Sequence, residues 1–279
     1  MTVSTRAIWA AYGAVAVAML VTYSRIDPSR LYHVSGHGFV HGGLSRVVVY
    51  LNFPVALVAA LLGGLAAARI GARLAGIVCV LLCLVVVVPG VVSQSNLDAK
   101  WVNAVPALGV GLALVLELRA GPGRSRVGRP ELVAVALLGL LSLVWIAAEL
   151  GFHETFGVFL AGQLRPGHPG PVAAAVHLGH HHGLDGAMLA ATAILLHDLP
   201  RSFAGRAYVA LMFAYGIVNC IQDAWTEQIV KRGWTGRTIP NALEPRLNTV
   251  WLVIVVIAVV AFLVPRRTVD DAPPAIIAR

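Results

Sequence analysis

The stretch His177-Leu178-Gly179-His180-His181-His182-Gly183-Leu184 places four histidines within six positions, immediately before a long apolar run. If the run is a helix whose first turns include this stretch, His177 and His181 lie one turn apart on one face, with His180 close to the same face. Imidazole is the commonest protein ligand for transition metals, and two imidazoles one helical turn apart can bind the same ion. The stretch therefore predicts a metal-binding helix start.

A similar stretch occurs in the first half of the chain. Residues 37–44 read His37-Gly38-Phe39-Val40-His41-Gly42-Gly43-Leu44, so both stretches fit H-x-x-x-H-x-G-L and both lead into an apolar run. A second pair of segments, 97–103 and 243–248, shares the order Leu, acid, small residue, base and Asn. Two repeated motifs in the same order and at similar offsets predict a tandem duplication.

The composition is that of a polytopic membrane protein. Of the 279 residues, 58% are hydrophobic and 12% are charged, with a mean hydropathy of +0.80. A soluble domain carries about 25% charged residues. We attribute the net charge of +8 to arginines at helix ends, which set topology and meet anionic lipid, and not to nucleic-acid binding. The three cysteines lie inside apolar runs and are expected to be buried hydrophobes.

We expect an all-α fold of about eight transmembrane helices in two tandem four-helix repeats, since a span needs about 20 apolar residues. The first repeat covers residues 1–120 and the second covers 132–264, with a basic Gly/Pro linker at 121–131 and a polar tail at 265–279. The expected spans are 7–23, 46–68, 74–92, 104–118, 132–150, 177–197, 207–223 and 248–264.

The repeat plan also predicts a topology. An even number of spans in each repeat puts both termini, and the loops after the second, fourth and sixth spans, on the same side of the membrane. This side holds more of the arginines, so the positive-inside rule places both termini in the cytoplasm of a bacterial-type plasma membrane. Both histidine motifs and both acid–base–Asn segments then share the non-cytoplasmic side.

The polar residues near that side form the predicted site. We expect the metal ligands to be His37, His41, His177, His180 and His181. Glu149 or Asp223 would be a further ligand or the general base, and such a nitrogen and oxygen set suits zinc, iron, manganese or copper. Residues expected to support the site or to contact the substrate are Asp98, Lys100, His153, Glu244 and Arg246. The alternative is that these side chains cap helix starts and bind headgroups at the membrane interface.

The two histidine pairs resemble the first two histidine boxes of the membrane fatty acid hydroxylase and desaturase superfamily. In that family such boxes hold a di-iron centre that activates oxygen. The resemblance covers about ten residues, His37-x-x-x-His41 and His177-x-x-His180-His181. The chain has no third H-x-x-H-H box, its expected site lies outside the cytoplasm, and its tandem plan differs, so the family is not assigned.

Three functions fit these patterns. The first is a membrane-embedded metal-dependent enzyme, hydrolytic or oxidative, with its site at the non-cytoplasmic surface and a lipid or lipid-linked substrate. The second is a metal-ion or proton-coupled transporter, although ionisable residues are few in the cytoplasmic half: Glu117, His197 and Asp198. The third is an electron carrier with haem held by histidines of opposed helices. The expected partners are membrane lipid and a small-molecule or lipid substrate, and no nucleic acid.

Overall fold

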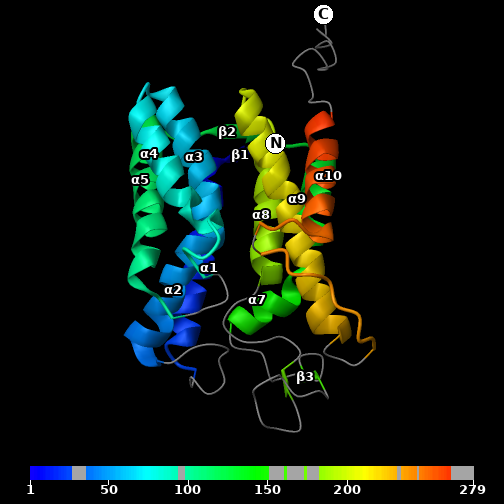
Figure 1. Ribbon diagram of the computed structural model, residues 1–279. Coiled ribbons are helices and arrows are strands. Elements are labelled where there is room, and N and C mark those ends of the chain that lie inside the picture. The colour runs from blue at the N-terminus through cyan, green and yellow to red at the C-terminus, as the bar shows by residue number, and fades with distance from the viewer. Residues whose placement is uncertain are drawn as a thin grey trace, which may run out of the picture.

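The computed structural model describes residues 1–26, 36–93, 98–150, 160–161, 173–174, 182–230, 234–243 and 245–264. The described part is helical, apart from two short antiparallel strand pairs (Figure 1). The predicted all-α class is therefore confirmed. Its helices lie roughly side by side in two groups, one from each half of the chain.

The first group packs around α3. Its elements are α1 (Thr5–Tyr23), η2 (Phe39–Leu44), α2 (Ser45–Tyr50), η3 (Leu51–Val55), α3 (Ala56–Arg69), α4 (Arg73–Leu84), η4 (Val85–Val87), η5 (Trp101–Asn103) and α5 (Ala104–Ala120). A Cβ at Gly63 of α3 would lie 2.5 Å from the Cys79 sulfur, and one at Gly109 of α5 would lie 2.7 Å from the Cys83 sulfur. The cysteines are thus free, buried packing residues, as predicted.

The second group packs around α8 and α9. Its helices are α6 (Arg129–Leu141), α7 (Leu143–Glu149), α8 (His182–Leu196), α9 (Phe203–Trp225), η7 (Thr226–Val230) and α10 (Thr249–Leu263). The helices α8 and α9 approach closely because Gly186 and Gly216 face each other, and a Cβ on either would lie 2.5 Å from the other's carbonyl oxygen. The strands are β1 (Thr2–Ser4), β2 (Arg124–Arg126), β3 (Leu160–Ala161) and β4 (Ala173–Ala174).

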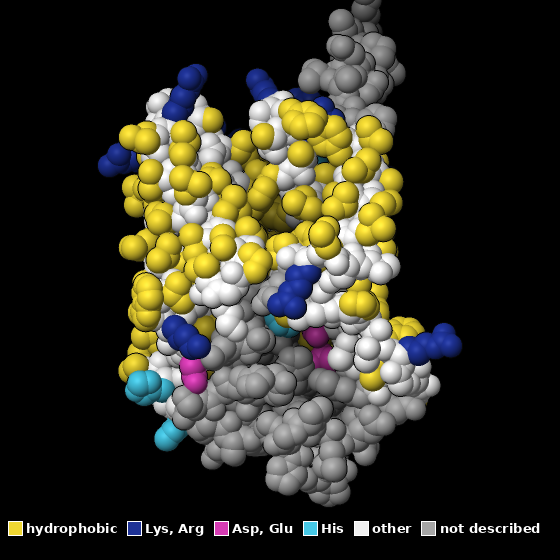
Figure 2. All heavy atoms as spheres, in the orientation of Figure 1, with side chains coloured by type: hydrophobic (Ala, Val, Ile, Leu, Met, Phe, Trp, Pro, Cys, Tyr) yellow, Lys and Arg dark blue, Asp and Glu magenta, His cyan; other side chains and the backbone are white. Residues whose placement is uncertain are grey.

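Four helices of the described part are long and apolar enough to cross a membrane: Thr5–Tyr23, Phe39–Arg69, Trp101–Ala120 and Phe203–Val230. A fifth is α6 with α7 if this pair, bent by 56°, counts as one span. The helices α8 and α10 have 15 residues each, which rise about 22 Å and fall short of a hydrocarbon core of about 30 Å. Figure 2 shows hydrophobic side chains over the middle of the molecule, as a membrane protein requires.

The two ends of the bundle differ in charge (Figure 2). At one end, which we call the basic end, β1 pairs with β2, and Gly123 lies against the side chains of Thr5, Arg69 and Leu199. This contact brings the N-terminus together with the segments that follow α3, α5 and α8. The opposite end, here the histidine end, carries His37, His41 and the start of α8.

The two groups share one apolar core. Tyr208 of α9 donates a hydrogen bond to the Leu57 carbonyl of α3 at 2.8 Å. The Phe53 ring packs edge-on against Tyr215, with ring centres 5.7 Å apart. Since Phe53 leaves the helical conformation just before Pro54, the long helix Phe39–Arg69 has a break facing the second group.

Candidate functional site

The start of α8 is held by two neighbouring elements. The Gly183 amide donates to the Asp223 carboxylate of α9 at 2.7 Å, which satisfies one of the N–H groups that a helix start leaves unpaired. The Trp145 ring of α7 lies so close to Gly183 that a Cβ there would collide with the ring. Gly183, the glycine of the histidine motif, therefore also has a role in packing α8 against α7 and α9.

Four buried carboxylates surround this helix start, and we call them the acidic cluster: Glu149, Asp185, Asp223 and Glu227. Their exposed fractions are 2%, 0%, 8% and 0%, respectively. Glu227 accepts a hydrogen bond from the Trp145 indole at 2.7 Å, and Glu149 follows Trp145 by one helical turn. Asp185 lies in the first turn of α8, where the helix dipole favours negative charge.

Arg46 of α2 is the cation that the first group contributes to this region. It is 2% exposed, and its Nη2 lies 3.8 Å from Glu149 Oε1. Its guanidinium carbon lies 5.8 Å from the centre of the Tyr23 ring. Within the described residues, none of its three guanidinium nitrogens makes a hydrogen bond. Arg46 is therefore a buried cation with one loose ion pair.

A series of hydroxyl groups leads from the acidic cluster toward the middle of the bundle. Tyr50 of α2 lies one helical turn from Arg46, and its hydroxyl donates to the Met188 sulfur at 3.6 Å. The Tyr50 and Tyr12 ring centres are 6.3 Å apart. The Tyr12 hydroxyl lies 3.2 Å from the Thr192 hydroxyl of α8. We call Tyr50, Tyr12 and Thr192 the hydroxyl series.

Two of the sequence-predicted site residues, Glu149 and Asp223, are buried members of the acidic cluster. His37 and His41 are exposed at the histidine end. Five of the other predicted ligands and supporting residues lie outside the described residues: His153, His177, His180, His181 and Glu244.

Asp98 and Lys100 lie apart from the acidic cluster. They line a separate pocket of about 290 Å³ with Val92 and Asn103, between the ends of α4 and α5. Asn103 in turn donates to the Asn52 side chain at 2.8 Å, which ties the start of α5 to the break in the long helix. Arg246 is exposed.

Sequence reasoning did not single out Arg46 or Glu227. Arg46 is simply the first residue of the expected span 46–68. The expected span 207–223 ends before Glu227, whereas α9 continues through η7 to Val230. The spacing of Asp223 and Glu227, four residues apart, is the signal for this continuation, since it puts both carboxylates on one helix face.

The described residues alone do not make a complete metal site. Among them, no three His, Cys, Asp or Glu side chains are grouped so that they could hold one ion. No family model, no curated protein and no solved structure matches this chain. The function is therefore argued from the geometry of this region.

Proposed function

We propose that the chain is a membrane-embedded metal-dependent enzyme whose reaction centre is the acidic cluster at the histidine end. The observation that carries this proposal is the burial of four carboxylates near the start of α8, with Arg46 lying 3.8 Å from one of them, Glu149. Ionised carboxylates are costly to bury unless protons, cations or hydrogen bonds compensate them. Ionisable groups within membrane helices are by default candidates for function.

A transition metal is the compensating cation that the sequence favours. His177, His180 and His181 directly precede His182 and so lead into the helix start that the acidic cluster surrounds. The described residues supply no group of three ligands. These histidines would therefore be the further ligands of the metal. The metal would be zinc, iron, manganese or copper, and when bound it would act as a Lewis acid or activate water.

The chain's own residues have distinct roles in this proposal. Asp223 holds the start of α8 through the Gly183 amide, and Trp145 orients the Glu227 carboxylate. Glu149 is placed to act as general base, with Arg46 balancing its charge. A site at this depth suits a lipid or lipid-linked substrate, and the reaction would be hydrolytic or oxidative.

The proposal includes the tandem plan of two four-helix repeats, eight spans and cytoplasmic termini. Equivalent glycines of the two histidine motifs support the duplication. A Cβ at Gly43 would collide with the hydroxyl of Ser24, the residue that follows α1, just as a Cβ at Gly183 would collide with Trp145 of α7. The gathering of arginines at the basic end supports the orientation.

Elemental analysis of the purified protein tests the metal. We expect about one or two equivalents per chain, as in one- and two-metal sites. The Asp185→Asn and His181→Ala variants should lose this metal, whereas Asp198→Asn, a carboxylate at the basic end, should retain it. The double variant His37→Ala/His41→Ala decides whether the first histidine motif contributes ligands. Wild-type protein without stoichiometric metal, prepared without chelators, would contradict the proposal.

A proton-coupled transporter is the second candidate, and the hydroxyl series favours it. Without a metal, the acidic cluster would hold protons, and Tyr50, Tyr12 and Thr192 would extend toward the middle of the bundle. The same elemental analysis separates the two functions, because the transporter needs no stoichiometric metal.

A further inference from the structure

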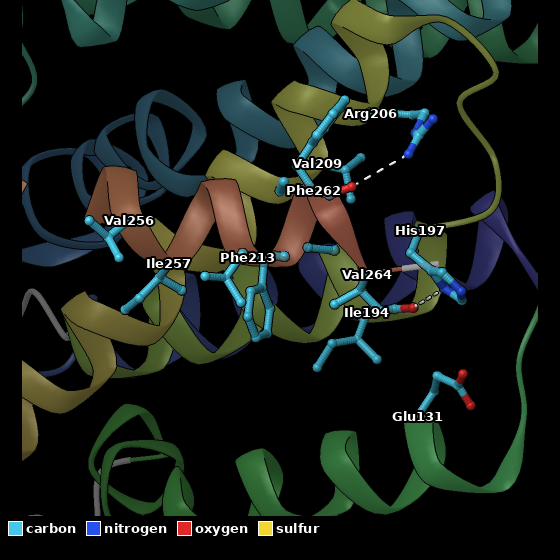
Figure 3. A pocket seen from close by; sticks show the side chains of 14 residues that line it. Glu131, Ile194, His197, Arg206, Val209, Phe213, Val256, Ile257, Phe262 and Val264 are labelled. Atoms are coloured by element: carbon cyan, nitrogen blue, oxygen red, sulfur yellow. Dashed lines mark hydrogen bonds between the residues drawn. The ribbon is translucent and has the colours of Figure 1, made fainter. Parts of the chain in front are cut away.

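A second cavity lies in the same group of helices as the acidic cluster, but nearer the basic end. It has a volume of about 530 Å³ and lies between α6, α8, α9 and α10 (Figure 3). Most of its lining is apolar, including Ile194 of α8, Phe213 of α9 and Val260 of α10. Val256 and Val260 are also 54% and 59% exposed, so the cavity opens on the side of the molecule that faces lipid.

Three polar side chains line one end of this cavity, toward the basic end: Glu131, His197 and Arg206. They come from α6, from the residue that follows α8, and from the first turn of α9. Figure 3 shows them along one edge, with aliphatic and aromatic side chains over the rest. The cavity therefore has one polar end, and the rest of its lining is apolar.

The bonding of these polar groups shows which of them are available to a ligand. His197 is engaged, with Nε2 3.1 Å from the Asp198 carboxylate and Nδ1 2.9 Å from the Ile194 carbonyl. Arg206 has its guanidinium carbon 4.8 Å from the centre of the Phe262 ring and donates one long bond of 3.4 Å to the Phe262 carbonyl. Within the described residues Arg206 has no carboxylate partner, and the buried Oε2 of Glu131 accepts no hydrogen bond.

We propose that this cavity binds a membrane phospholipid with a phosphoethanolamine head. The phosphate would pair with Arg206, the ammonium would donate to Glu131, and one acyl chain would lie along α10. The stretch from Val256 to Val264 rises about 12 Å, which accommodates a substantial part of an acyl chain. The available carboxylate disfavours a purely anionic head, because like charges repel. This site is independent of the proposed metal chemistry.

Native mass spectrometry of the intact chain in detergent tests the head group. The probes are phosphatidylethanolamine, phosphatidylcholine and phosphatidylglycerol with identical acyl chains. We expect phosphatidylethanolamine to bind about tenfold more tightly than phosphatidylcholine, whose quaternary ammonium has no N–H to donate. Glu131→Gln should remove most of this preference, and Arg206→Gln should weaken all three phospholipids about tenfold. The matched control is Arg201→Gln, an exposed arginine just before α9 that does not line the cavity.

A second pair of variants tests the apolar part. Val260→Trp fills the cavity and should abolish binding, and Val260→Phe is a milder filling variant in case the tryptophan prevents folding. Val259→Trp, on the same helix but outside the lining, should bind as wild type does. Equal binding of the three lipids with no effect of Arg206→Gln would overturn the proposal. Unchanged lipid binding by a folded Val260 variant would also overturn it. So would a dimer of the chain that the Val260 variants alone disrupt, because the cavity would then be an interface between two copies.

Discussion

Two arginine–glutamate pairs connect helices of this protein, one at each end of the bundle. At the basic end, Arg69 Nη2 lies 3.1 Å from Glu117 Oε2 and also donates to the Gly121 carbonyl at 2.8 Å. The Thr5 hydroxyl donates to the other oxygen of Glu117. At the histidine end, Arg46 lies 3.8 Å from Glu149, and its guanidinium makes no hydrogen bond within the described residues.

The difference separates a structural pair from a functional candidate. A buried charge is tolerated when hydrogen bonds and a close counter-charge replace its water. The pair at the basic end has both a close counter-charge and further hydrogen bonds. Through Thr5 it also connects the start of α1 to the end of α5. The pair at the histidine end leaves donors of Arg46 available to another anionic group, which is what a substrate site requires.

The largest expected effect is at the well-bonded pair. Glu117→Ala removes the carboxylate that accepts hydrogen bonds from Arg69 and Thr5. Both donors then lose this partner near the protein interior. We expect a loss of about 3 kcal/mol in the free energy of unfolding, measured by denaturant titration in mixed micelles. Arg119→Ala, an exposed arginine two residues away, should change the same quantity by about 0.5 kcal/mol or less. Equal effects of the two variants would show that the pair at the basic end is not structural.

A smaller effect is expected when both members of the loose pair are replaced. The double variant Arg46→Met/Glu149→Gln removes both charges and keeps the side-chain volumes similar. Because replacing a buried ion pair by neutral groups is often neutral or stabilising, we expect a change of less than about 1 kcal/mol in unfolding free energy. A loss of about 3 kcal/mol or more would show instead that this pair holds the two groups of helices together.

Much of the fold was predictable because apolar runs and charges at helix ends are local signals. The expected spans 104–118 and 248–264 agree closely with the bounds of α5 and α10, although α10 is shorter than a membrane span. The grouping of the N-terminus with the loops at the basic end is observed. The expected span 132–150 is instead bent by 56° after Leu141. There the Ser142 hydroxyl donates to the Leu138 carbonyl at 2.7 Å, a local competition with helical bonding that apolar periodicity does not report.

The site was harder to predict, because its burial depends on contacts between distant segments. Glu149 and Asp223 were recognised as carboxylates at span ends, and both are buried in the acidic cluster. The place of Arg46 depends on α7, about 100 residues later in the chain, and no local pattern encodes that contact. The roles assigned to His37, His41 and the histidines of residues 177–181 stay predictions, which the metal analysis tests.

The smallest expected effect concerns how Arg46 is held. Since the guanidinium carbon of Arg46 lies 5.8 Å from the centre of the Tyr23 ring, a cation–π interaction replaces part of the lost hydration and is worth about 1 kcal/mol. Tyr23→Phe keeps the ring and Tyr23→Leu removes it, so the difference in unfolding free energy between these variants isolates the ring. When the same two Tyr23 variants are made in the Arg46→Met/Glu149→Gln protein, the cation is gone. The difference in unfolding free energy between them should then fall to the difference in packing alone. If it stays the same, the ring acts by packing, and the guanidinium depends on Glu149 alone.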